Sequence, residues 1–174
     1  NRMTAVKNQQ EIAVMREGGG KLWNILQILL REAQAGVSLF SLEEIAQERI
    51  RKADAIPSFS TVKGYKWATC LCINDEVVHG IPSPRMLEDG DVLTIDIGMV
   101  YKGFHTDTAW TKIIQQKTEN NKQKTDKEKE KFLRVGEETL QKAIGVAKAG
   151  NRVGHISQII EQTITDAGYS VVRS

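Results

Sequence analysis

The chain has 174 residues, of which 40% are hydrophobic and 26% are charged, which is the composition of about one globular domain and excludes collagen-like or wholly disordered chains. Its 24 basic and 22 acidic residues nearly balance at a formal charge of +2, which argues against nucleic acid, and specific DNA in particular, as the main ligand. No apolar run reaches the ~18 residues of a membrane span, and we find no secretion signal before the first helix. Cys70 and Cys72 are too close together for a disulfide between them to cross-link a distant loop. We therefore expect a cytoplasmic protein with no membrane partner.

Two helices are predicted at the start of the chain. Residues 9–36 carry apolar side chains at three- and four-residue spacing, and Gly18-Gly19-Gly20 within them predicts a bend or a close backbone contact. Ser41-Leu42-Glu43-Glu44 resembles a capping box that opens a second helix reaching to about Lys52.

Strands follow the helices. After an expected loop at 58–66, short strands are predicted at 69–73 and 76–79. The clearest strands are 92–100 and 104–114, because Leu93, Ile95, Ile97 and Met99 alternate with polar or small residues, as in a half-buried sheet.

Two acidic residues on the last two strands are the strongest functional signal. If Tyr101 and Lys102 form a two-residue loop, Asp96 lies directly opposite Asp107 on one face of the sheet. Ionised carboxylates placed so close repel each other, and a divalent cation between them would remove that repulsion. The alternative is that one aspartate caps a turn while a bulge throws the other outward.

The remainder of the chain is helical and polar. Residues 115–131 contain no hydrophobic residue and are expected to form a solvated, Lys-rich loop. Helices are then predicted at 129–149 and 155–166, with a strand beginning at 171–172. These helices repeat the first pair in an ungapped register, because Ala149-Gly150 matches Ala35-Gly36 and Ile156 matches Leu42.

The histidines and cysteines leave alternatives open. His79 precedes Gly80 at an expected strand end, where it is either an acid–base group or a hydrogen-bonded structural histidine. His105 is expected beside the aspartates or at the surface, and His155 at the surface or capping a helix. Cys70 and Cys72 share one face of an extended segment and are expected to be small buried side chains, with Cys70 facing a pocket for a sulfur-bearing substrate.

Several motifs, in order, resemble those of type I methionine aminopeptidases. They are Cys72–Pro82 (CINDEVVHGIP), Leu87–Val92 (LEDGDV), Ile95–Gly98 (IDIG) and Gly103–Ala109 (GFHTDTA). The resemblance extends over essentially the whole chain. It implies an α/β pita-bread (creatinase/aminopeptidase) fold, in which an antiparallel sheet carries outer helices in two pseudo-symmetric halves. We therefore expect one domain over 1–174 whose second half is incomplete: a first half at 1–115, a loop at 116–131, and helices of the second half at 132–174.

The same resemblance implies an activity and a site. The family removes the N-terminal methionine from nascent proteins by two-metal hydrolysis, with Co, Mn, Fe, Zn or Ni as the metal. Asp96 would bind one ion and Asp107 would bridge both. His79 would be the catalytic residue that contacts the scissile amide, while Tyr65 and Cys70 would line the pocket for the methionine side chain.

The resemblance also sets expectations about what this chain lacks. After Val171-Val172-Arg173 the family continues into a segment that supplies one histidine and two glutamate ligands, so metal binding and activity of this chain alone are expected to be weak or absent. Thr106 stands where the family usually has glycine. Two other interpretations remain: a non-catalytic pita-bread module that binds peptides or the ribosome, and a homo-oligomer or complementing chain that supplies the missing half.

Overall fold

A computed structural model describes residues 6–115 and 126–172. The chain divides into two compact units, Asn1–Asn121 and Lys122–Ser174, and each is described by itself. Most of the expected loop at 116–131 lies outside the described residues, although its last residues are helical. Within the described residues, no helix is long and apolar enough to cross a membrane.

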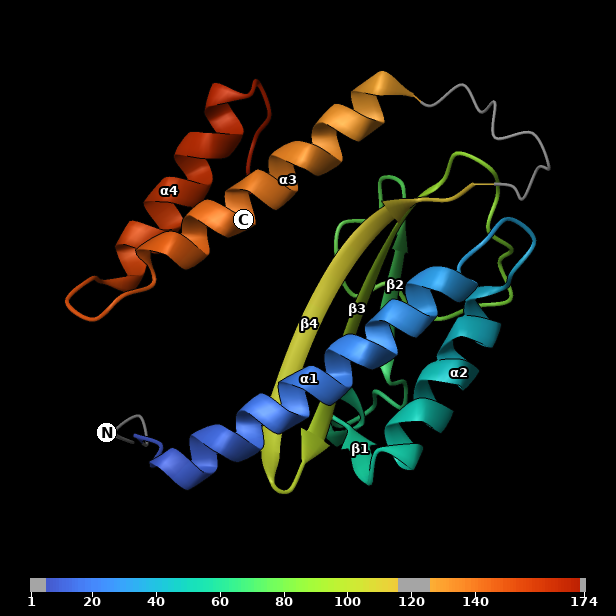
Figure 1. Cartoon of the computed structure of the whole chain (residues 1–174). Helices are drawn as coiled ribbons and strands as arrows, with labels where there is room; N and C mark the ends of the chain where they lie inside the picture. The colour runs from blue at the N-terminus through green and yellow to red at the C-terminus, as the bar shows by residue number, and fades with distance from the viewer. Residues whose placement is uncertain (1–5, 116–125, 173–174) are drawn as a thin grey trace. The chain divides into compact units, whose positions relative to one another are not determined.

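The first unit contains a four-stranded antiparallel sheet (Figure 1). The central strand β3 pairs along its whole length with β4, and its other edge is shared by β1 and β2. The strands are β1 (Ala55–Pro57), β2 (Thr69–Ile73), β3 (Val92–Tyr101) and β4 (Phe104–Ile113). The prediction of a strand at 76–79 is wrong, because none is described between β2 and β3, whereas β1 was not predicted.

Two helices, α1 (Gln9–Glu32) and α2 (Leu39–Lys52), cover one face of this sheet (Figure 1). Alternate residues of β3 point into the core beneath them and are fully buried, namely Leu93, Ile95, Ile97 and Met99. They meet a helix surface formed by Leu22, Leu26, Leu29, Leu42, Ala46 and Ile50. The residues between them on β3, including Asp96, therefore lie on the opposite face of the sheet.

Gly18 of α1 allows a close helix–sheet approach without ending the helix. A Cβ atom on Gly18 would lie 3.3 Å from the Cβ atom of Tyr101, and Gly18 is buried. The predicted close contact is thus confirmed at Gly18. The helix ends at Glu32, four residues earlier than position 36, and α2 begins after the N-cap Ser38, whose hydroxyl accepts from the backbone N–H of Ser41.

The second unit is a pair of helices, α3 (Lys127–Val146) and α4 (Val153–Asp166). Both predicted helices are confirmed, and Asp126 caps α3 by accepting from Glu128 and Lys129 backbone N–H groups. His155 Nδ1 accepts from the backbone N–H of Arg152 at 3.2 Å, which confirms its predicted capping role. The strand predicted at 171–172 is absent, since neither described residue is in a strand.

Candidate functional site

The β3–β4 hairpin sets the position of the two aspartates. Its loop consists of Lys102 and Gly103, whose φ angles are +47° and +85°. Left-handed values at both loop positions are those of a type I′ turn, which favours glycine at the second position. Tyr101 therefore pairs with Phe104, and Asp107 lies opposite Gly98. The predicted register, with Asp107 directly opposite Asp96, is wrong by two residues.

The aspartates nevertheless share one face of the sheet. A shift of two residues keeps every side chain on its original face, so Asp96 and Asp107 become diagonal neighbours on the face away from α1 and α2. Burial raises the pKa of Asp96, as do the charge of Asp107 and a hydrogen bond with it, and together these influences bring it to about 6. The pairing is continuous from Val92 to Tyr101, so the bulge that would turn one aspartate outward is not present.

His79 belongs to the same group of side chains. The next residue, Gly80, is hydrogen-bonded to Leu71, and the neighbour of Leu71, Cys70, pairs with Asp96, so the chain at His79 runs close to that carboxylate. The charge of His79 lowers the pKa of Asp96, against the other influences. His79 does not end a strand as predicted; it lies in the loop between β2 and β3 and is exposed, with a φ of +58°. Such a left-handed backbone is uncommon for a residue other than glycine.

Cys70 and Tyr65 lie together beside the aspartates. Cys70 pairs with Asp96 across β2 and β3 and is buried. The Tyr65 hydroxyl donates to the carbonyl oxygen of Thr69 at 2.7 Å and lies 3.3 Å from the Cys70 sulfur. Burial is the main cause that raises the pKa values of both the Tyr65 hydroxyl and the Cys70 thiol. Both groups are therefore neutral near pH 7, and Cys70 and Cys72 are both free thiols.

Ser58 and Phe59 also border the site, and the sequence did not identify them. A Cβ atom on Gly98 would lie 2.8 Å from Cε1 of Phe59, so the ring covers the sheet between the aspartates and β1. The rings of Phe59 and Tyr65 meet edge to face, with their centroids 6.4 Å apart. The Ser58 hydroxyl lies 2.7 Å from Nδ1 of the exposed His105. These contacts depend on the pairing of β1 with β3, which no short-range pattern indicates.

A buried carboxylate, Glu43, fixes the strand that carries Cys70. Glu43 is 1% exposed and accepts hydrogen bonds from the backbone N–H groups of Ala68 and Thr69, at 2.7 and 3.0 Å. It also accepts from the Thr69 hydroxyl at 2.5 Å. Its position on the buried side of α2 was a possible signal, since a glutamate at an apolar helix position is almost always paired.

The aspartate pair fits a divalent cation in its chemistry. Carboxylate oxygens are the ligands that hard divalent ions prefer, and a cation between Asp96 and Asp107 would relieve the repulsion that raises the pKa of Asp96. Across residues 6–115 and 126–172, however, no group of three or more histidine, cysteine, aspartate or glutamate side chains is arranged to hold a metal. The described residues thus offer two candidate metal ligands rather than a closed coordination shell.

Comparisons with known proteins agree with this geometry. The sequence pattern of metallopeptidase family M24 matches residues 13–174. Methionine aminopeptidase 1 of Bacillus subtilis is 37% identical over 171 residues, which cover 98% of this chain and 66% of that protein. A methionine aminopeptidase of Clostridium perfringens gives the same figures. The chain therefore spans slightly less than two thirds of these relatives.

Solved structures give the same result. The crystal structure of methionine aminopeptidase from Thermotoga maritima matches with a TM-score of 0.90 and 32% identity, over 99% of this chain and 66% of that one. The prolidase of Pyrococcus horikoshii matches with a TM-score of 0.76 at 17% identity, which shows likeness of fold alone.

Proposed function

The chain belongs to metallopeptidase family M24, and from this we propose that it forms the aspartate-bearing and substrate-binding part of a methionine aminopeptidase. The reaction would be hydrolysis of the first peptide bond, with release of the N-terminal methionine. The observation that carries the proposal is the placement of Asp96 and Asp107 as diagonal neighbours on the sheet face away from α1 and α2, with His79 close by. The names of the relatives support this function over a non-catalytic binding module.

Each side chain would have a separate task. Asp96 and Asp107 would hold divalent metal ions. Such ions, when bound, lower the pKa of a coordinated water and polarise the carbonyl group of the substrate. His79 would donate a hydrogen bond to the scissile amide from the edge of the aspartate pair. The neutral Cys70 and Tyr65 would face the methionine side chain, because a buried thiol and an aromatic ring suit a soft thioether.

Metal binding is the direct test of this assignment. Mn²⁺ binding can be followed by the loss of the free-ion electron paramagnetic resonance signal for the wild type, Asp96→Asn and Asp107→Asn. Both substitutions are expected to weaken binding at least tenfold. Asp54→Asn is a matched control, since Asp54 is an exposed aspartate at the end of α2 whose left-handed backbone asparagine tolerates. Unchanged binding in both site variants would overturn the metal assignment.

Methionine release from a Met-Ala peptide, measured in the same samples, tests the activity. We expect slow release by this chain alone, because the described residues supply only two metal ligands. That release should disappear in both aspartate variants. Brisk release that survives either substitution would contradict the mechanism. Peptide binding that survives both a chelator and Asp96→Ala would instead support the non-catalytic module.

Partners follow from the same proposal. Substrates would be nascent chains, which would bring the protein close to the ribosome exit. The helices α3 and α4 carry large apolar side chains with high exposure, such as Phe132, Ile144 and Val153. A second copy or a complementing chain would be able to cover them, and a concentration-independent monomer in sedimentation would count against such a partner.

A further inference from the structure

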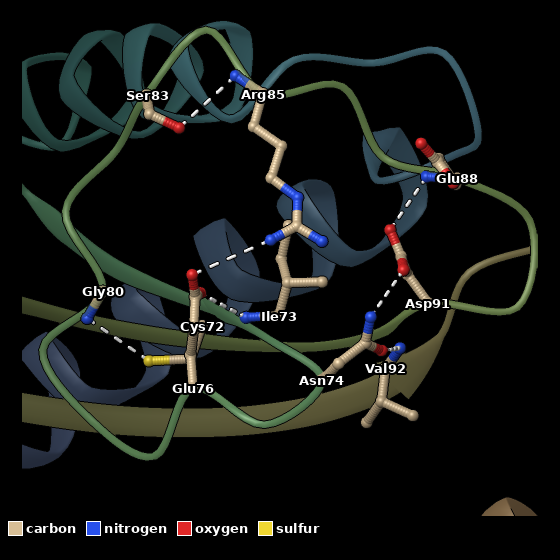
Figure 2. Close-up of polar contacts among 10 residues, drawn as sticks. All are labelled: Cys72, Ile73, Asn74, Glu76, Gly80, Ser83, Arg85, Glu88, Asp91 and Val92. Carbon is tan, nitrogen blue, oxygen red and sulfur yellow. Dashed lines mark hydrogen bonds and ion pairs between the residues drawn. The ribbon is translucent and has the colours of Figure 1, made fainter.

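In the loop that carries His79, Gly80 makes two hydrogen bonds to β2. The backbone N–H of Leu71 donates to the Gly80 carbonyl oxygen at 2.8 Å. The backbone N–H of Gly80 in turn donates to the Cys72 sulfur at 3.3 Å (Figure 2). Leu71 and Cys72 are buried residues of β2, so the anchor is part of the rigid sheet.

Only glycine fits at this anchor. A Cβ atom at position 80 would lie 2.2 Å from the Leu71 carbonyl oxygen and 2.7 Å from its carbonyl carbon. Both are backbone atoms of a strand, which cannot move aside as a flexible side chain would. Any larger residue therefore has to lift this part of the loop from β2.

The two ends of the loop are fastened separately from the anchor (Figure 2). At one end, the Glu76 carboxylate accepts from the backbone N–H of Ile73 at 2.8 Å. At the other, Asp91 accepts from the Asn74 side-chain amide at 2.8 Å and from the backbone N–H of Glu88 at 2.9 Å. The loop is thus closed without any contribution from Gly80.

Side-chain packing does not hold the residues just before His79. Val77 and Val78 are 60% and 67% exposed, so neither is buried against the sheet. His79 itself adopts a left-handed backbone that costs free energy unless its surroundings enforce it. The next residue, Gly80, is where the segment meets β2.

We propose that Gly80 and the Cys72 thiol are positioning residues that hold the imidazole of His79 beside Asp96. A catalytic role for His79 at this position rests on the proposed function, whereas the placement of His79 by the anchor is independent of it. Losing the anchor leaves the loop closed and the sheet intact, but frees His79 to move away from the aspartate.

The test measures the coupling between His79 and Asp96 by nuclear magnetic resonance, without metal or peptide. The chain has only three histidines, so the ring signal of His79 can be assigned from single His→Gln variants. At a fixed alkaline pH, Asp96→Asn is expected to shift the His79 ring signal and leave that of His155 unchanged. The size of this shift reports how close the two side chains are.

The same Asp96→Asn change is then made in anchor variants. In Gly80→Ala and in Cys72→Ala the His79 response should fall at least twofold. Cys72→Ser should restore it, because the serine hydroxyl can still accept from the Gly80 N–H. Gly19→Ala is the matched control, since a Cβ atom there meets nothing within 4 Å, and it should leave the response unchanged.

The outcomes separate this proposal from the enzymatic one. An unchanged response in both Gly80→Ala and Cys72→Ala would overturn the positioning role, whatever the peptidase assay shows. So would a wild-type His79 signal that does not respond to Asp96→Asn. Where Gly80→Ala fails to fold, the comparison of Cys72→Ala with Cys72→Ser decides the question, with backbone signals of β3 confirming an intact sheet.

Discussion

Replacing Asp96 with asparagine is expected to stabilise the metal-free protein at neutral pH. Burial, and next the charge of Asp107, raise the pKa of Asp96 from 3.8 to about 6. The folded state therefore binds this proton more tightly than the unfolded state. The resulting loss of stability begins as the pH rises above 3.8 and is complete above about 6. At about 1.4 kcal/mol per pKa unit the full cost is about 3 kcal/mol, and solvent screening at this partly exposed site reduces it to on the order of 2 kcal/mol.

Urea unfolding of both proteins near pH 4 and near pH 8 measures this cost. Asp96→Asn should be more stable than the wild type by about 2 kcal/mol near pH 8, and by less than about 1 kcal/mol near pH 4. Saturating Mn²⁺ should reverse the order near pH 8, because it stabilises only the folded protein that binds it. A stability difference that is the same at both pH values would refute the reasoning, as would an equal gain in the Asp54→Asn control.

Three further substitutions test the packing around the site by urea unfolding. Glu43→Ala leaves the buried donors of Thr69 without an acceptor and should destabilise the fold by about 3 kcal/mol, and a loss below about 1 kcal/mol would contradict the buried network. Gly98→Ala should cost about 1–3 kcal/mol because its Cβ atom would press on Phe59. Gly20→Ala, where a Cβ atom meets nothing within 4 Å, should instead stabilise α1 by about 0.5–1 kcal/mol, so an equal effect of both glycine substitutions would argue against the Phe59 contact.

The pita-bread fold expected from the motifs is confirmed by the solved relatives, and the sheet's main strands were predictable for a physical reason. One face of β3 is fully buried beneath α1 and α2, which imposes a strict period of two on its sequence. The helices α1 and α2 were predictable for a similar reason, because each buries one side in the same core. Their ends were less so, since α1 ends at Glu32 although apolar residues continue beyond it.

The strand expected at 76–79 shows what local pattern cannot supply. Val77 and Val78 have the side chains typical of strands, yet both are largely exposed. A strand also needs a partner along its length, and this segment meets β2 only near its two ends, at Glu76 and at the following Gly80. The residue before Gly80, His79, is left-handed. Conversely, β1 has three residues and owes its conformation to pairing with the end of β3.

The aspartate pair could be predicted despite an incorrect register, because the register was wrong by an even number of residues. A hairpin loop at Lys102-Gly103 instead of Tyr101-Lys102 moves the pairing by two residues, and side chains in a strand return to the same face every two residues. A shift of one residue would have sent Asp107 to the helix-covered face and removed the site. The shift of two changes only the spacing: neighbours directly opposite have Cβ atoms ~4.5–5.5 Å apart, whereas diagonal neighbours lie ~7–8 Å apart. The two carboxyl groups still reach each other across this diagonal, since a hydrogen bond between them is one of the influences that raise the pKa of Asp96.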